Sequence, residues 1–499
     1  MVSVRTRLGR GVAWLTAARM LVNAMQALSM LVLTHLLLPG DLGVVVIALT
    51  MLSLLISLTD VQLSSALVQH RAPDETHYDT AWTFGLGRGV LVAVLFALAA
   101  YPTAWIYHDD RLAGLMIALG LGAIVGGLEN PRTIMLTKQL VFWQQFVLQV
   151  AGKATSVVVS VGVAFIWRSY WALVVGGLAG SIVTLAVSYL LLPYRPRPTL
   201  VRGRELFSFS IWLTLGQFVT RLNWSSDPLL IGAVLGSALL GTYAVGSMVA
   251  MIVTREVTAP LAGLLFPAFS TMNDDRPRLI AAYQAAQGFL VAIALPAGVG
   301  TAILADSLVR VAMGDQWAGA VPVIRILAPV FALQTLGFMA QPAAMALGAT
   351  RLLFLRDLQG FAMRVPLVLS GVMLFGLQGA VCARVVSGLL LILLDMSVVT
   401  RTLGLTIGMQ LSRVWRSVLS AAAMAAVLLL IDRLIGPVHG IAGDIARMVL
   451  LGIVGMLSYA IIHFLAWHWS HRPPGPEDEA VRVWNKVSQR WMRRRVHGQ

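Results

Sequence analysis

Residues 211–224 read IWLTLGQFVTRLNW and repeat the pattern of residues 13–26, AWLTAARMLVNAMQ. The two Trp-Leu-Thr triplets lie 198 residues apart, and the same offset places Leu42-Gly43 on Leu240-Gly241. We place six apolar spans between the two copies. An even number of spans makes the two halves parallel, a symmetry found in transporters with a central site between the halves. The repeat therefore predicts an internally duplicated membrane protein.

The apolar spans fill the chain from residue 12 to residue 469. The sequence is 58% hydrophobic and only 12% charged. Because a bilayer core of about 30 Å requires roughly 20 apolar residues per helix, this length holds about 14 transmembrane helices. We predict an all-α, polytopic membrane protein with two parallel, pseudo-symmetric six-helix lobes around a central cavity and two C-terminal helices. The predicted parts are an N-lobe at 1–205, a C-lobe at 206–405, two helices at 406–470 and a basic tail at 471–499.

Lys and Arg residues outside the spans are distributed unequally between the two sides. When loops are assigned alternately, the side that holds both termini has about 24 basic residues, with Arg356 among them. The other side has about 5, namely Arg111, Arg168, Arg310, Arg433 and Arg447. The positive-inside rule then predicts that both termini are cytoplasmic.

The net charge of +15 does not indicate nucleic-acid binding, because the basic residues flank the membrane spans. Affinity for anionic lipids of the inner leaflet explains them better. The single cysteine, Cys382, lies in an apolar span, and no phosphate-binding loop or HExxH zinc motif occurs. We expect no metal, no cofactor and no enzymatic activity.

The tail contains an apolar stripe of Val481, Trp484, Val487 and Trp491 beside a run of arginines at 493–495. This pattern is typical of an amphipathic helix that lies on a membrane surface. We interpret it as a cytoplasmic anchor, and a helix that docks a partner protein is the alternative.

Polar residues inside the spans carry the functional signal. An arginine at the bilayer centre costs about 2.5–3.5 kcal/mol on insertion scales, so it normally faces a bundle interior or a wet cavity. The basic residues within the spans are Arg19, Arg88, Lys153, Arg221, Arg255, Arg325, Arg364 and Arg384. Arg325 and Arg384 lie near span ends, and we expect them to reach the membrane interface.

Three of these residues belong to polar stripes. Arg19, Asn23 and Gln26 have i, i+4, i+7 spacing and share one helix face. Gln217 and Arg221 repeat this spacing in the second copy, and Gln149 and Lys153 do so in the fifth span. Such stripes are either interhelical hydrogen bonds that fix packing or the wall of a binding cavity.

Carboxylates within or at the edges of the spans are too few to neutralise the cations. They are Asp60, Glu129, Asp227, Glu256, Asp357 and Asp395. The surplus of positive charge favours a cavity for an anionic substrate, such as a diphosphate or an acidic sugar. Because a buried carboxyl can exchange protons, Glu256 and then Asp227 are candidates for coupling to a proton or sodium gradient, and a structural salt bridge is the alternative.

Several ordered sequence blocks carry a family resemblance over roughly residues 8–435. They are LLPGDLG at 37–43, ALVQ at 66–69, DTAW at 79–82, LGTY at 240–243, FPAFS at 266–270, LPAG at 295–298, LADSL at 304–308, MGDQW at 313–317 and LGAT at 347–350. The chain resembles the oligosaccharidyl-lipid flippases (Wzx-type polysaccharide transporters) of the multidrug/oligosaccharidyl-lipid/polysaccharide exporter superfamily.

The resemblance implies alternating access around a central cavity in a bacterial cytoplasmic membrane. The cargo would be an undecaprenyl-diphosphate-linked oligosaccharide for exopolysaccharide, capsule or O-antigen synthesis. Contacts with a polysaccharide polymerase and other assembly proteins are also implied. Related lipid II flippases have cavity arginines on the first and eighth helices, which implies this role for Arg19 and Arg255.

Two other functions remain open from the sequence. A cation-coupled drug or metabolite antiporter of the same superfamily predicts a more acidic and aromatic cavity. A membrane polysaccharide polymerase or ligase predicts a large extracytoplasmic loop with catalytic residues, whereas the longest loop on that side is about a dozen residues, around 304–316.

Overall fold

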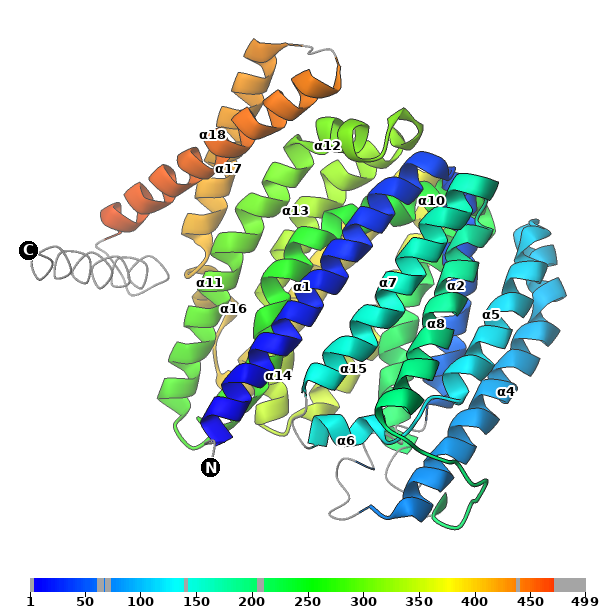
Figure 1. Cartoon of the computed structure of the whole chain (residues 1–499). Helices are drawn as coiled ribbons and strands as arrows, with labels where there is room; N and C mark the ends of the chain where they lie inside the picture. The colour runs from blue at the N-terminus through cyan, green and yellow to red at the C-terminus, as the bar shows by residue number, and fades with distance from the viewer. Residues whose placement is uncertain are drawn as a thin grey trace, which may run out of the picture. The chain divides into compact units, whose positions relative to one another are not determined.

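The structure is a computed structural model that describes residues 4–60, 67, 73–138, 142–203, 211–436 and 440–470 (Figure 1). Within these ranges every regular element is a helix, which confirms the predicted all-α class. The predicted tail at 471–499 lies outside the described residues. The chain divides into two compact units, Met1–Ala244 and Val245–Gln499. The lobe boundaries predicted from the repeat remain predictions.

The first unit contains α1 to α8 and the first part of α10. The helix bounds are α1 Val4–Leu36, α2 Pro39–Thr59, α4 Glu75–Tyr107, α5 Arg111–Gly127, α6 Thr133–Lys138, α7 Phe142–Trp167, α8 Trp171–Leu191 and α10 Ile211–Ser270. Helix α7 packs along α8, α4 along α5, and α1 along α7.

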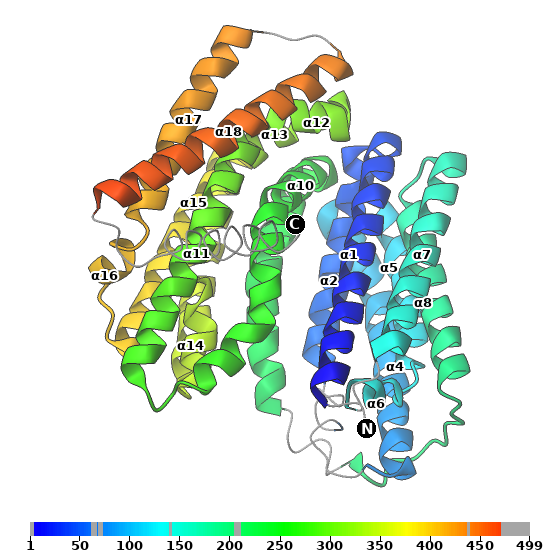
Figure 2. The ribbon, with the colours of Figure 1, turned by 60° about the vertical axis from the view of Figure 1, so that its left-hand side comes forward.

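The second unit contains the remainder of α10 and the helices that follow it. Their bounds are α11 Arg276–Ile303, α12 Ala305–Ala312, the short 3₁₀ helix η1 Asp315–Trp317, α13 Ala320–Phe338, α14 Ala340–Ala346, α15 Thr350–Leu403, α16 Ile407–Leu411, α17 Trp415–Ile435 and α18 Ile441–Trp469. Helix α13 packs against both α11 and α15, and α17 pairs with α18 (Figure 2).

Eleven helices of the described chain are long and apolar enough to cross a membrane, and α5 is a shorter apolar helix. Two of the longest helices are each interrupted by a glycine. Helix α10 is broken at Gly236, where φ is +80°, and α15 is broken at Gly376, where φ is +60°. Only glycine adopts such angles without strain. The predicted breaks between spans fall at these two positions, and the count of fourteen helices remains a prediction.

Helix α15 turns back on itself at Gly376. A side chain added at Gly371 would overlap the backbone of Gly379, and one added at Gly379 would overlap the backbone of Gly371. Two residues eight positions apart in a straight helix lie about 12 Å apart and cannot meet in this way. Helix α15 is therefore an antiparallel pair of spans.

Small residues allow close approach between the helices of the first unit. Gly85 and Gly127 bring α4 and α5 into backbone contact, and Gly176 receives the Ser160 side chain between α7 and α8. Lipid tails are as apolar as leucine, so membrane helices associate through van der Waals packing rather than through burial from water. Close backbone approach maximises this packing.

Three turns of the first unit are joined by Arg111. Its guanidinium lies 3.1 Å from Asp41 Oδ1 and 2.8 Å from Asp109 Oδ2, and it donates to the Ser237 hydroxyl at 3.3 Å. The Ser237 hydroxyl in turn donates to Asp109 at 3.0 Å. The cluster links the α1–α2 turn, the α4–α5 turn and the Gly236 turn, which the charge distribution predicts to lie on one side of the membrane.

A reciprocal backbone contact underlies this cluster. A side chain added at Gly43 would overlap the Ser237 carbonyl, and one added at Gly241 would overlap the Pro39 carbonyl. Under the 198-residue offset, Gly43 corresponds to Gly241 and Pro39 corresponds to Ser237. A two-fold axis that relates the two copies produces a contact of this reciprocal kind. It supports the predicted duplication.

The Arg111 cluster makes acid stability depend on Asp109. Burial raises the pKa of this carboxyl, but hydrogen bonds from Arg111 and Ser237 and the charge of Arg111 together hold the pKa below its ordinary value of 3.8. Because the folded-state pKa is lowered, the stabilisation is complete above the unfolded-state pKa and is lost as pH falls through the folded-state value. We expect Asp109→Asn to melt at lower temperature than wild type at pH 7 and to lose less stability on acidification.

Thermal unfolding of the purified protein at pH 7 and at about pH 3 tests this expectation. Asp110→Asn is the matched control, because Asp110 is exposed and its side chain makes no helix-capping hydrogen bond. Equal melting temperatures for Asp109→Asn and wild type at pH 7 would contradict the assignment.

Candidate functional site

Helices α1 and α7 pack side by side and run in the same direction. Trp14 meets Phe146 edge to face, with ring centroids 5.0 Å apart. Two turns further along both helices, Val22 and Lys153 line the same cavity. This register places Arg19, one turn before Val22, at about the same height as Gln149 and Lys153. The polar stripes predicted on the first and fifth spans thus lie on neighbouring helices.

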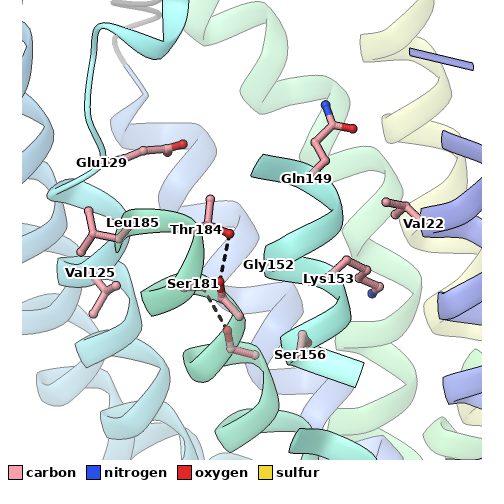
Figure 3. A pocket seen from close by; sticks show the side chains of 13 residues that line it. Val22, Val125, Glu129, Gln149, Gly152, Lys153, Ser156, Ser181, Thr184 and Leu185 are labelled. Atoms are coloured by element: carbon pink, nitrogen blue, oxygen red, sulfur yellow. Dashed lines mark hydrogen bonds between the residues drawn. The ribbon is translucent and has the colours of Figure 1, made fainter. Parts of the chain in front are cut away.

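The cavity has a volume of about 410 Å³ and lies among α1, α5, α7 and α8 (Figure 3). Gln149 and Lys153 stand one turn apart on α7, and Glu129, just after α5, lies on the opposite wall. The hydroxyls of Ser156 and Thr184 also line it. A cavity with a cation, an amide and several hydroxyls can bind an anionic or hydroxyl-rich group.

The wall between α7 and α8 is formed by small residues. An added side chain at Gly152 would overlap Thr184, and one at Gly180 would overlap the backbone of Gly152. The hydroxyl of Thr184 donates to the Gly180 carbonyl at 2.9 Å, which satisfies it within its own helix. Satisfied hydroxyls can still accept one further hydrogen bond from a ligand.

The α1 stripe is exposed along its whole length. Arg19, Asn23 and Gln26 are all exposed, and the Arg19 guanidinium makes no ion pair with any residue in the described ranges. Lys153 is half-buried and likewise forms no ion pair within the part of the chain that the structure describes. These two cations therefore remain available to an anion.

Arg88 is paired with a carboxylate, whereas the sequence predicts that it contributes to an unpaired surplus of positive charge. Its Nη1 lies 3.0 Å from Oδ1 of Asp60 at the end of α2. This carboxylate neutralises much of the charge that the sequence assigned to a substrate cavity. The cavity role of Arg88 remains a prediction, and its paired charge is less available to a substrate than the charge of Lys153.

Residues of the second copy occupy the first part of α10. The Nε of Arg221 donates to the Ser53 hydroxyl at 3.1 Å, and the side chain is exposed. The side chain of Gln217 lies outside the described residues. Asp227 is buried and lies 3.5 Å from the Tyr243 hydroxyl across the Gly236 turn.

Arg255 and Glu256 belong to the second unit. Both side chains are exposed, and the cavity of the first unit includes neither. Adjacent helix positions point about 100° apart, so one face of the helix cannot present both. Their predicted roles in cargo binding and ion coupling remain predictions.

One expectation for the remaining arginines is wrong. Arg384 was expected to reach the membrane interface from a span end, but only 2% of it is exposed and its guanidinium lies over the Phe331 ring at 5.2 Å. It is a packed residue of the second unit, as is the equally buried Arg364. Arg325 is exposed and pairs with Asp306 at 2.5 Å.

Sequence reasoning missed the hydroxyl wall of the cavity. Ser156, Ser181 and Thr184 line it, yet serine and threonine are common in apolar helices and carry no signal of their own. A signal was present in the spacing, because Gly152 and Ser156 continue the Gln149–Lys153 face, and Gly177, Ser181 and Thr184 share one face of α8.

The arrangement of helices matches solved membrane transporters. The lipid II flippase MurJ in an inward closed conformation superposes with a TM-score of 0.75, at 12% identity, over 92% of this chain and 100% of MurJ. A multidrug resistance MATE family transporter in an inward-facing conformation gives a TM-score of 0.63, at 14% identity, over 79% of this chain and 98% of that protein. The chain is thus a multi-pass membrane protein with the fold of these transporters.

The family model for polysaccharide biosynthesis proteins matches residues 32–322, and the chain belongs to this family. It is 22% identical to the lipopolysaccharide biosynthesis protein WzxC of Escherichia coli over 67% of this chain and 69% of WzxC. It is 26% identical to the succinoglycan biosynthesis transport protein ExoT of Rhizobium meliloti over 64% of this chain and 65% of ExoT. The chain thus aligns with about two thirds of the length of these relatives.

Proposed function

We propose that the protein is a flippase that moves an undecaprenyl-diphosphate-linked oligosaccharide across the cytoplasmic membrane by alternating access. The activity is transport rather than catalysis. Both termini are cytoplasmic, and the cargo enters from the inner leaflet. The product supplies exopolysaccharide, capsule or O-antigen synthesis.

Family membership is the observation that carries this proposal. The family model covers more than half of the chain, and ExoT is named as a transport protein of succinoglycan biosynthesis. The shared fold of MurJ adds support, since that protein is named as a lipid II flippase. A cargo that is anchored in lipid and carries a polar, sugar-containing head agrees with both of these names.

The charges of the first unit suit a diphosphate. A diphosphate carries at least two negative charges and cannot cross hydrocarbon unaided, because an ion in a medium of low dielectric is strongly destabilised. Arg19, Lys153 and Arg221 make no ion pair among the described residues, and Arg221 donates to the Ser53 hydroxyl. These residues, with Asn23 and Gln26 beside Arg19, form the proposed cationic surface.

The size of the cavity limits what it can hold. At about 410 Å³ it falls within the range of roughly 300–1,000 Å³ that is typical of small-ligand pockets. An oligosaccharide on a diphosphate is larger than this pocket. We therefore assign the pocket to one part of the head group only.

The alternative of a drug or metabolite antiporter is less well supported. It requires acidic groups that bind a cation, whereas the cavity of the first unit combines Lys153 with a single carboxylate, Glu129. Of the two candidates for coupling to an ion gradient, Asp227 is the better placed. It is buried beside Tyr243, whereas Glu256 is exposed. We propose Asp227 as the coupling group to test first.

The test is complementation of a strain that lacks the protein. We expect the lipid-linked oligosaccharide to accumulate on the cytoplasmic leaflet, wild type to clear it, and the double variant Arg19→Ala/Arg221→Ala to reduce clearance at least tenfold. Two lost ion–phosphate hydrogen bonds, each worth about 1.5–3 kcal/mol, account for such a loss.

Arg168→Ala/Arg278→Ala is the matched control, because it removes two exposed arginines outside the proposed surface. Normal arrival of the intermediate at the outer leaflet in the deletion strain would disprove the flippase function. Full clearance by the Arg19/Arg221 variant would instead disprove the proposed surface and leave the function intact.

A further inference from the structure

A second cavity of about 440 Å³ lies in the first unit, beside the start of α4. Its walls are the first turns of α4, Arg132 before α6, and residues 193–197 after α8. These three segments belong to loops that the charge distribution predicts to be cytoplasmic. The cavity is separate from the one that contains Lys153, and the proposed transport function does not use it.

The segment after α8 is held in place along α4. Burial raises the pKa of the Tyr194 phenol, which therefore keeps its proton and donates to Asp79 Oδ1 at 2.5 Å. The backbone N–H groups of Arg197 and Thr199 donate to Asp79 and Thr83 at 3.2 and 3.0 Å. Pro196 and Pro198 restrict the backbone further. The segment is thus rigid before any ligand arrives.

Arg132 serves to build the cavity wall. It pairs with Glu75 at 2.5 Å, donates to the Pro193 carbonyl at 2.8 Å and lies over the Tyr194 ring at 5.1 Å. Glu75 is thereby neutralised, and Asp79 accepts two hydrogen bonds at Oδ1 from uncharged donors. Three arginines face two carboxylates in this lining, so it keeps a net positive charge.

Arg195 and Arg197 are the surplus cations of this cavity. Both side chains line it and are exposed, and neither forms an ion pair with the residues that the structure describes. Because the prolines and hydrogen bonds fix the backbone of both residues, binding one anion has to order only their side chains. Guanidinium groups match the oxygens of phosphate in paired hydrogen bonds.

Aromatic residues next to the cavity indicate its depth in the membrane. The indole N–H of Trp82 donates to the Tyr189 hydroxyl at 3.0 Å, and the rings of Tyr189 and Tyr194 stack at 6.3 Å. Tryptophan and tyrosine gather at the level of lipid head groups. The two arginines therefore face the layer in which lipid phosphates lie.

We propose that this cavity is a binding site for a phosphate-bearing lipid head group, with Arg195 and Arg197 as its anion ligands. Two sources share this chemistry, namely an anionic phospholipid of the inner leaflet and the diphosphate of a polyprenyl-linked cargo. The second source rests on the proposed function, whereas the site itself does not.

Native mass spectrometry of the detergent-solubilised full chain tests the site. The probes are phosphatidylglycerol, undecaprenyl diphosphate and, as the zwitterionic comparison, phosphatidylcholine. We expect at least one of the two anionic lipids to bind at least tenfold more tightly than phosphatidylcholine. Arg195→Gln/Arg197→Gln should remove this preference, because glutamine retains the backbone hydrogen bond of residue 197 and loses only the charge.

Arg278→Gln/Arg351→Gln is the matched control, since both arginines are exposed and lie in loops predicted to be on the same side. Tighter binding of undecaprenyl diphosphate than of phosphatidylglycerol identifies the cargo as occupant, and tighter binding of phosphatidylglycerol identifies membrane lipid. Equal binding supports the site through the phosphate chemistry that the two lipids share. An undiminished preference in the Arg195/Arg197 variant, or an equal loss in the control, overturns the site. Binding is measured without transport, so failure of the flippase function leaves this result interpretable.

Discussion

Replacing Arg356 by leucine is expected to destabilise the second unit by about 3–5 kcal/mol, the cost of removing one partner from a buried ion pair. Arg356 Nη1 lies 2.5 Å from Oδ1 of Asp395, and its Nη2 lies 3.1 Å from Asp357. Only 13% of the Arg356 side chain and 9% of the Asp395 side chain are exposed. Removal of the guanidinium leaves a carboxylate in the protein interior without its cation.

A second substitution distinguishes this cause from lost packing. Asp395→Asn removes the carboxylate charge with almost no change in shape, so it should restore much of the stability when combined with Arg356→Leu. Arg325→Leu is the comparison for an exposed pair, because Arg325 and Asp306 are each about half exposed. We expect that variant to lose no more than about 1 kcal/mol.

Thermal unfolding of the purified variants, followed by tryptophan fluorescence, measures these effects. The expected order of melting temperatures places wild type and Arg325→Leu highest, the double variant below them and Arg356→Leu lowest. If Arg356→Leu and Arg325→Leu have the same melting temperature, the buried ion pair contributes no more stability than the exposed pair, and our interpretation fails.

The second large effect is expected at the reciprocal glycine contact. Gly43→Ala and Gly241→Ala each place a methyl group against a backbone carbonyl of the facing segment. Inserting a methyl group into a packed interior typically costs about 1–3 kcal/mol, and a rigid backbone on the receiving side puts the expected cost at the upper end of that range. Both variants should melt at lower temperature and support less transport.

Gly40→Ala is the matched control on the same helix turn. A methyl group at Gly40 meets Arg111 Nη2 at 3.8 Å, which is ordinary van der Waals contact. Alanine also favours a helix over glycine by about 1 kcal/mol, so this variant should be at least as stable as wild type. Melting temperatures of Gly43→Ala and Gly40→Ala that agree within error would rule out the close contact.

The all-helical membrane class and the breaks between spans could be predicted from the sequence, because hydrophobic length and glycine position act locally. A span must be about 20 residues long whatever its neighbours are, and a sharp break needs a residue that tolerates positive φ. The breaks at Gly236 and Gly376 are therefore visible in the chain itself. The parallel register of α1 and α7 follows from the alternation of spans, and the Trp14–Phe146 contact agrees with it.

The partners of the charged residues could not be predicted in the same way. Arg88 meets Asp60 across 28 residues, and Arg356, counted with the loop cations, meets Asp395 across 39 residues. Which helix faces lie together depends on packing between elements, and helical periodicity describes each element alone. For the same reason, a position near a span end did not distinguish the buried Arg384 from the exposed Arg325.

The contact between Gly43 and Gly241 also has a consequence for ancestry. In a symmetric dimer of a half-length chain, the two subunits would make this contact with each other. One substitution at the glycine would then change both sides of the contact at once. Fusion into one chain allows the two positions to change separately. Asp41, which pairs with Arg111, has Leu239 as its counterpart, and Pro39 has Ser237. The predicted duplication thus combines a symmetric glycine contact with two sides that differ in chemistry.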